Sequence, residues 1–286
     1  MVSPEYAAAL AALVSGIQRP AELARLFPRP APDVAWTAVD AGGAPAEWVT
    51  AGDMGEDGGA FLYLHGGGYT EGSPASHREL VSRLVRHAGA PALSVDYRLA
   101  PQHPYPAALD DAIGAWTWLS GRLGPDRVAI VGDSAGGGLA LALAMWLRDH
   151  GRPGPAMVAA LCPWTDLSLA DAEGAQDPLI DVSALRERGR SYLGDADPRT
   201  PYASPLHGRM EGLPPLFLHA GDCDVLKDDA ARFAARAAAA GAAVEFEAWP
   251  GMTHVWHALG DVVPEARDAT RRAGAAIGAA LRRAAA

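Results

Sequence analysis

One serine lies between two glycines in the stretch GDSAG, which runs from Gly132 to Gly136. The apolar run RVAIV precedes this stretch and the apolar run GLALALAMWL follows it, as in a strand–turn–helix unit. A G-x-S-x-G turn in that context points the serine hydroxyl out of the sheet, where it can attack a carbonyl carbon. The spacing does not fit a phosphate-binding loop. Ser134 is therefore the candidate nucleophile, and a glycine-rich turn with a helix-capping serine remains the alternative.

A second glycine-rich stretch, HGGGY at residues 65–69, ends an earlier apolar run. Three consecutive glycines expose backbone N–H groups that no side chain covers, and such groups can bind a developing oxyanion. Parallel strands bring their carboxyl ends to one edge of a sheet, where open α/β proteins place their sites. The two glycine stretches together predict an acyl-transfer site, although a flexible loop would also explain HGGGY alone.

A serine nucleophile needs a histidine base and a carboxylate that orients the base, in the order serine, acid, histidine for this type of site. His254 follows the last expected strand, in WPGMTHVWH, and is the candidate base. His257 lies three residues further on, and we expect it to pack in the interior or contact the surface. We assign no catalytic role to the three other histidines after Ser134, which are His150, His207 and His219.

The acid comes from GDCDVLKDD, which holds four aspartates. A calcium loop of the D-x-D-x-D-G type is excluded, because the fifth and sixth residues counted from Asp222 are Leu226 and Lys227. Two of the aspartates, Asp228 and Asp229, fit the first turn of the following helix, where the helix dipole favours negative charge. Asp222 and Asp224 remain as candidates.

Alternating apolar strands and amphipathic helices must position these residues. The pattern predicts an α/β fold with an eight-stranded, mostly parallel sheet flanked by helices, and its first two strands, at residues 34–39 and 46–51, form an antiparallel hairpin. The other strands are expected within 60–65, 90–98, 127–134, 156–164, 214–221 and 243–251, and the helices within 1–30, 76–87, 107–123, 138–150, 228–241 and 265–283. Residues 165–212 interrupt this alternation of strands and helices as a long insertion, which is typical of a lid or binding element.

The motifs HGGGY, VDYRLAPQHPYPAALDDA, GDSAGG, SPLHGRMEGLPPLFLHAGDCDVLKDDA and WPGMTHVWH together resemble the hormone-sensitive lipase family of α/β-hydrolases, the bacterial type IV esterases. The resemblance extends from about residue 33 to the end of the chain. It implies one domain over residues 1–286, with a helical cap built from residues 1–30 and 165–212. It also implies a triad of Ser134, Asp224 and His254, where aligning DVLKDD with the family's acid motif selects Asp224 and leaves Asp222 as the runner-up.

The same resemblance implies that the oxyanion donors are the N–H groups of Gly67, Gly68 and Ala135, with Gly66 as an alternative. It also suggests that Asp133 has a structural role beside the nucleophile. In the family's DYRLAPQHPYPAALDDA signature, it suggests a buried polar network of Asp96, Arg98 and Asp110.

The composition excludes several other classes. A net charge of −10 argues against general nucleic-acid binding, which needs basic residues to neutralise phosphates. No apolar run reaches the ~18 residues of a membrane span. The two cysteines, Cys162 and Cys223, suit neither a disulfide framework nor a zinc site, and they fit a cytoplasmic location.

The sequence thus predicts a serine carboxylesterase for short-chain or cyclic esters, which needs no metal or organic cofactor. Alternatives are a non-catalytic receptor on the same fold, a membrane-docked lipase, and a lactonase, amidase or deacetylase with the same chemistry. Tyr69, Trp164 and Val255 are candidates for the pocket wall. A homodimer through the last strand and helix is a further expectation.

Overall fold

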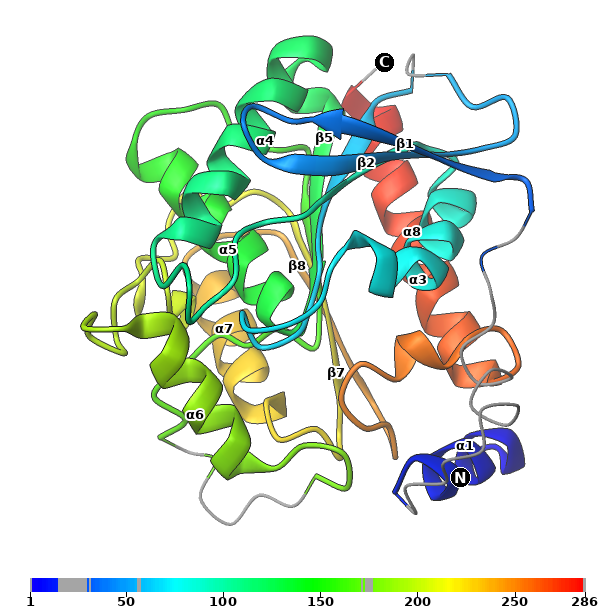
Figure 1. Cartoon of the computed structure of the whole chain (residues 1–286), viewed down its shortest axis with the longest axis vertical. Coiled ribbons are helices and arrows are strands. Elements are labelled where there is room, and N and C mark those ends of the chain that lie inside the picture. The colour runs from blue at the N-terminus through cyan, green and yellow to red at the C-terminus, as the bar shows by residue number, and fades with distance from the viewer. Residues whose placement is uncertain are drawn as a thin grey trace.

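The computed structural model describes residues 2–14, 30, 32–55, 58–170, 172 and 177–284. Its centre is an eight-stranded sheet with the order β1-β2-β4-β3-β5-β6-β7-β8, in which β1, β2 and β4 pair antiparallel and all other neighbours pair parallel (Figure 1). The predicted eight strands and the antiparallel first hairpin are confirmed. The strands are β1 Val34–Asp40, β2 Pro45–Ala51, β3 Ala60–Leu64, β4 Ala92–Val95, β5 Val128–Asp133, β6 Val158–Leu161, β7 Leu216–Gly221 and β8 Val244–Trp249.

Helices cover both faces of the sheet, which explains why β3 to β7 are completely buried and mostly apolar. On one face lie α3 (Pro74–Ala88) and α8 (Pro264–Ala284), and on the other lie α4 (Ala107–Leu123), α5 (Ser134–Asp149) and α7 (Lys227–Ala239). Strand β3 serves both layers, since Phe61 packs in the α3/α8 layer and Leu62 in the other. The described residues also form three short 3₁₀ helices, which are η1 Pro125–Arg127, η2 Pro205–His207 and η3 Trp256–Leu259.

Strand register places the glycine motifs side by side. Leu64, the last residue of β3, pairs with Gly132 in the central strand β5. The HGGG loop therefore starts next to the turn that carries Ser134. Strands β7 and β8 run parallel to them and end near residues 221 and 249, so the acid and histidine segments leave the sheet at the same edge.

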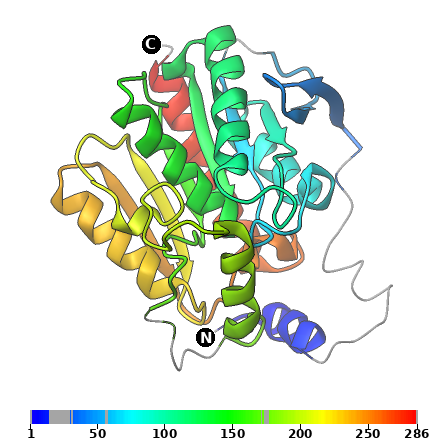
Figure 2. The ribbon, with the colours of Figure 1, turned by 60° about the vertical axis from the view of Figure 1, so that its left-hand side comes forward.

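Two helices outside the sheet layers lie at the same end of the molecule (Figure 2). They are α1 (Pro4–Val14) and α6 (Val182–Leu193), and α6 begins at Asp181, whose carboxylate accepts the N–H groups of Ser183 and Ala184. The expected cap segments include them. The rest of the N-terminal segment, residues 15–29, and residues 171 and 173–176 of the insertion lie outside the described residues.

The expectation of a buried polar network of Asp96, Arg98 and Asp110 is wrong. Arg98 instead forms a bidentate salt bridge with Asp111 at the surface, with Nη2–Oδ1 and Nε–Oδ2 distances of 2.8 and 2.9 Å. Asp96 and Asp110 are exposed. The helical turn of α4 presents Asp111 to Arg98, a choice between adjacent aspartates that depends on the position of the helix.

Both cysteines are free, Cys162 in the interior and Cys223 at the surface. None of the helices that the structure describes is long and apolar enough to cross a membrane.

Candidate active site

Ser134 occupies a tight turn between β5 and α5. Its φ of +52° lies in the left-handed region, which costs free energy for a residue other than glycine and is typical of functional turns. A Cβ on Gly132 would overlap the carbonyl oxygen of Gly136, and one on Gly136 would overlap the carbonyl oxygen of Leu64. The two glycines of the motif are therefore needed so that the turn can close on itself and pack against the end of β3.

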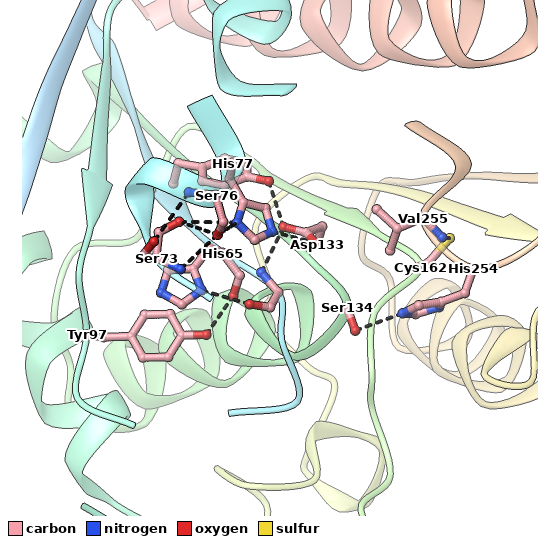
Figure 3. Close-up of polar contacts among 12 residues, drawn as sticks. His65, Ser73, Ser76, His77, Tyr97, Asp133, Ser134, Cys162, His254 and Val255 are labelled. Carbon is pink, nitrogen blue, oxygen red and sulfur yellow. Dashed lines mark hydrogen bonds and ion pairs between the residues drawn. The ribbon is translucent and has the colours of Figure 1, made fainter. Parts of the chain in front are cut away.

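The serine hydroxyl meets a histidine and a carboxylate in line. His254 Nε2 lies 2.8 Å from Ser134 Oγ, and Nδ1 lies 3.0 Å from both carboxylate oxygens of Asp224 (Figure 3 shows the serine–histidine contact). Asp224 is 5% exposed, and its Oδ1 also accepts the N–H of Leu226 at 2.9 Å. Asp222 lies at the surface and accepts the N–H of Gly251, so it is not in contact with His254. These distances allow His254 to take the serine proton while Asp224 holds the imidazole.

The surrounding charges keep His254 basic. Burial by itself lowers the pKa of His254, but the carboxylate of Asp224 and its hydrogen bond, together with the charges of Asp177 and Asp133, raise it above the ordinary value of 6.5. A histidine that gains basicity from buried carboxylates is a better acceptor for the serine proton.

Side chains from distant segments hold the backbone on both sides of His254. The N–H of Thr253 donates to the hydroxyl of Tyr6 at 2.8 Å, and the N–H of Val255 donates to Cys162 Sγ at 3.4 Å. Val255 has a φ of +45° and Cys162 a φ of +50°, so both ends of this contact are in the left-handed region. Figure 3 shows Cys162 and Val255 next to His254. Sequence reasoning missed Tyr6 and gave Cys162 no role at the site, because no local pattern marks either contact.

The HGGG loop turns sharply beside Ser134. Gly67 and Gly68 have φ values of +119° and +61°. The N–H of Gly66 donates to the carboxylate of Asp133 at 3.0 Å, which removes Gly66 as an alternative oxyanion donor. Gly67 and Gly68 line a cavity together with Ser134 and His254. The backbone of Ala135 follows the serine at the start of α5.

A buried carboxylate, Asp133, anchors the HGGG loop from behind. Besides Gly66, it accepts the hydroxyl of Tyr63 at 2.6 Å and faces His77 Nε2 at 3.5 Å (Figure 3). Burial raises the pKa of Asp133, but the charge and hydrogen bond of His77, together with the hydrogen bond from Tyr63 and the nearby His65, lower it below its ordinary value. For His77, burial lowers the pKa and Asp133 raises it, with a net increase. The structural role expected for Asp133 thus has a specific form, which is to hold the oxyanion loop against the nucleophile turn.

The histidine of the HGGG motif, His65, is buried and has no place in the serine–histidine contact. Its ring stacks on Tyr97 with centroids 4.2 Å apart, and its Nδ1 lies 2.7 Å from the carbonyl oxygen of Gly66. Burial lowers its pKa to about 4, so it stays neutral near pH 7. His65 therefore stiffens the start of the loop.

His257 is completely buried and bonds to another histidine. Its Nε2 lies 2.9 Å from His219 Nδ1, and His219 Nε2 lies 2.9 Å from the carboxylate of Glu247. Burial lowers the pKa of His257 well below its ordinary value. Of the two positions expected for His257, the interior and the surface, the structure shows the interior, and His219 is buried beside it.

The cavity above the nucleophile has a volume of about 340 Å³. One wall is formed by the oxyanion loop, and the opposite wall is largely apolar and comes from the insertion and the start of α7. Its lining residues are Gly67, Gly68, Glu71, Ser134, Leu179, Ile180, Asp181, Ala184, Leu185, Arg188, Leu226 and His254.

The expected pocket residues Tyr69, Trp164 and Val255 do not line this cavity, so this expectation is wrong. Tyr69 is 1% exposed and its ring stacks on Tyr192 with centroids 3.7 Å apart. Trp164 is completely buried and its indole N–H donates to the carbonyl oxygen of Asp166. The side chain of Val255 packs with the cluster of Tyr6, Met252 and Trp256. Tyr69 and Trp164 thus belong to the core, and Val255 packs against it.

Among the described residues, one group has donor atoms close enough together for a metal ion. It consists of Cys162, Asp224 and His254, whose donor atoms lie within 4.8 Å of one another. Burial raises the pKa of the Cys162 thiol well above its ordinary value, whereas a metal requires the thiolate. A metal here would also compete with the bond between Asp224 and His254, so the donor set suits a hydrogen-bonded triad better.

Comparison with known proteins agrees with this geometry. The family model described as alpha/beta hydrolase fold matches residues 61–258. An acetyl-hydrolase of Streptomyces hygroscopicus is 46% identical over 242 residues, which are 83% of this chain and 80% of that protein. The carboxylesterase NlhH of Mycobacterium tuberculosis is 37% identical over 238 residues, 77% of this chain and 73% of the relative.

Solved structures extend the likeness to nearly the whole chain. An esterase/lipase from an uncultured bacterium superposes with a TM-score of 0.90 at 37% identity, covering 98% of this chain and 99% of the other. An esterase from the bacterial hormone-sensitive lipase family gives a TM-score of 0.90 at 35% identity with the same coverage.

Proposed function

The chain belongs to the hormone-sensitive lipase family of α/β-hydrolases and is a carboxylic ester hydrolase, and we propose that it hydrolyses short-chain or cyclic esters through an acyl-enzyme on Ser134. The observation that carries the proposal is the continuous contact of Ser134 Oγ, His254 and Asp224, at 2.8 and 3.0 Å. A non-catalytic receptor would not need this arrangement.

In the first half-reaction, Ser134 Oγ forms a bond to the ester carbonyl carbon while His254 Nε2 takes its proton. Asp224 accepts a hydrogen bond from Nδ1–H of His254 and stabilises the positive charge of the imidazolium without taking the proton. The carbonyl oxygen becomes an oxyanion that accepts hydrogen bonds from the backbone N–H groups of Gly67, Gly68 and Ala135. When the carbon–oxygen bond of the ester breaks, His254 gives its proton to the leaving alcohol.

In the second half-reaction, water replaces the alcohol. His254 takes a proton from the water as its oxygen attacks the acyl carbon, and the same oxyanion donors stabilise the new tetrahedral intermediate. The bond to Ser134 Oγ then breaks, and the serine recovers its proton from His254 as the carboxylic acid leaves. His254 thus carries both protons of this cycle, one from Ser134 to the alcohol and one from the water back to Ser134.

The size of the cavity supports small substrates. About 340 Å³ is at the low end of ligand pockets, and the apolar side chains of Leu179, Ile180, Leu185 and Leu226 suit a short acyl or alcohol group. The acetyl-hydrolase relative fits a short acyl group as well. Lactones are the cyclic esters to include in the substrate panel, and amides and acetylated amines test the amidase and deacetylase variants.

The test combines activity with active-site labelling. The wild-type protein should hydrolyse nitrophenyl acetate and butyrate faster than the octanoate and should react with a fluorophosphonate probe at Ser134. Ser134→Ala should lose both signals and keep the wild-type melting temperature. Turnover by a folded Ser134→Ala protein would disprove the assignment of the nucleophile.

The proposal also covers the cap, the oligomeric state and the location of the protein. The helices α1 and α6 act as the cap, which is supported by the contribution of α6 to the cavity wall.

A homodimer forms through β8 and α8, since β8 is an edge strand of the sheet. The free thiols of Cys162 and Cys223 suit the reducing cytoplasm. Sedimentation velocity of the wild-type protein and of Val244→Lys tests the dimer, and cell fractionation tests the location.

A further inference from the structure

One cationic side chain joins helix α6 to the HGGG loop. Nη1 of Arg188 donates to the carbonyl oxygen of Gly67 at 3.2 Å and to Thr70 Oγ1 at 3.0 Å, and it pairs with Glu71 Oε1 at 2.7 Å. The aliphatic stem of Arg188 covers Gly68 so closely that a Cβ on Gly68 would lie 2.7 Å from Arg188 Cδ. Arg188 therefore contacts four residues of the loop, although it lies 121 positions after Gly67 in the chain.

The contact reaches the oxyanion donor through a single peptide unit. The carbonyl of Gly67 and the N–H of Gly68 belong to the same planar amide, in which the C=O and N–H bonds point in opposite directions. The N–H groups of Thr70 and Glu71 also donate to this carbonyl oxygen, each at 3.1 Å. A hydrogen bond to the oxygen of an amide polarises the amide and makes its N–H a stronger donor. The effect is largest when the group that bonds to the oxygen is charged.

We propose that Arg188 is a positioning residue that sets the orientation and donor strength of the Gly68 N–H in the oxyanion hole. The inference rests on the proposed function, because it takes Gly68 as an oxyanion donor. Arg188 acts through the Gly67–Gly68 amide. Its side chain is 34% exposed, and the charge is partly screened there, so most of the effect comes from direct contact with the amide.

The arrangement makes the oxyanion hole depend on the cap. Helix α6 supplies Arg188 and also the cavity residues Ala184 and Leu185. When substrate packs against these residues, α6 is held in the position at which Arg188 reaches Gly67. Binding of the acyl or alcohol group and stabilisation of the oxyanion are therefore coupled through one helix.

The test compares Arg188→Met and Arg188→Lys with Arg190→Met. Methionine keeps an unbranched stem over Gly68 and removes the donors, whereas lysine keeps one charged donor. Arg190 lies on the same helix and is exposed, so it controls for the loss of a positive charge from α6. For nitrophenyl acetate, kcat and kcat/KM of Arg188→Met should both fall about tenfold with little change in KM, since the lost stabilisation is specific to the transition state. Arg188→Lys should fall between Arg188→Met and the wild type, and Arg190→Met should match the wild type.

Two further readouts separate positioning from a structural role. Guanidinium chloride at millimolar concentration should restore part of the activity of Arg188→Met and none of that of Ser134→Ala. A trifluoromethyl ketone inhibitor, which forms a tetrahedral oxyanion on the serine, should lose affinity by the same factor as kcat/KM.

Unchanged kcat in both Arg188 variants would overturn the inference, and so would a rise in KM alone, which would make Arg188 a substrate-binding residue. Both results leave the proposed function standing if fluorophosphonate still labels Ser134. If the probe did not label the wild-type protein, that result would instead contradict the proposed function itself.

Discussion

Tyr6 and Thr253 lie 247 residues apart in the chain and form a reciprocal pair of hydrogen bonds. The hydroxyl of Tyr6 accepts the N–H of Thr253 at 2.8 Å and donates to Thr253 Oγ1 at 3.0 Å, with both side chains 1% exposed. Thr253 immediately precedes His254. The N-terminal helix α1 thus contacts the loop that carries the proposed base, His254. Ser3, just before α1, ties the same end of the chain to α8 through its hydrogen bonds to Glu265.

Replacing Tyr6 by phenylalanine should weaken both folding and catalysis. The change leaves the buried N–H and hydroxyl of Thr253 without their partner, which costs about 1–3 kcal/mol of unfolding free energy. We expect kcat to fall more than KM rises, because the loop holding His254 loosens while the cavity walls stay in place. Urea unfolding and steady-state kinetics measure the two effects. Tyr202→Phe is the control, since its hydroxyl bonds to Asp149 at the surface. Equal behaviour of the two variants would contradict the role of Tyr6.

The two aspartates on either side of Cys223 should behave very differently. Asp224→Asn removes the charge that orients His254, and we expect kcat to fall about 10³- to 10⁴-fold. Asp222→Asn should stay near the wild-type rate, because an asparagine oxygen can still accept the N–H of Gly251. Both variants are measured with nitrophenyl acetate after their melting temperatures have been compared. A slow Asp222→Asn variant and a fast Asp224→Asn variant would instead assign the role of the acid to Asp222.

The pH profile should report the raised pKa of His254. The base must be neutral to accept the serine proton, so kcat/KM rises as pH passes its pKa, and the midpoint should lie above 6.5. Asp177→Asn removes one of the charges that raise this pKa and should move the midpoint to lower pH. Glu187→Gln, an equal change of charge on the exposed side of α6, should leave the midpoint in place. An identical shift in both variants would indicate a general effect of net charge.

The glycine after the nucleophile turn should be irreplaceable. In Gly136→Ala the new methyl group would overlap the carbonyl oxygens of Leu64 and His65, which are backbone atoms of β3 and its loop. We expect a loss of about 3 kcal/mol or more of unfolding free energy. Gly121→Ala in α4 meets nothing within 4 Å and should gain about 0.5–1 kcal/mol. Urea titration compares the two, and a stable Gly136→Ala protein would show that the strand end can shift.

Much of the site could be predicted from the sequence because its chemistry sits in short local motifs. The backbone geometry of each short turn requires the glycines around Ser134 and in HGGG, and such local requirements can be recognised in the amino-acid sequence. The alternation of apolar strands and amphipathic helices predicts the parallel sheet, whose carboxyl edge gathers these motifs. Chain order and the position after the last strand then select His254.

The choice between adjacent or nearby residues depended on the tertiary structure. Asp222 and Asp224 occupy the same short loop, and the residues alone left both open as the acid, although the family resemblance favoured Asp224. The direction in which each side chain leaves the backbone makes Asp224 the buried partner of His254 and Asp222 a surface residue. The same reason explains why Asp111 and not Asp110 pairs with Arg98. Aromatic residues close to the motifs could line a pocket or fill the core, and packing against Tyr192 places Tyr69 in the core.

By itself, the sequence determined the fold class and the reaction type of this protein and the candidates for nucleophile and base, because local backbone requirements and strand order encode them. Only the tertiary structure revealed the residues that support the site from a distance. Tyr6, Cys162 and Arg188 contact the histidine loop and the oxyanion loop across 247, 93 and 121 residues. No periodicity or motif marks such contacts, because folding creates them when it brings α1, the end of β6 and α6 to the same edge of the sheet.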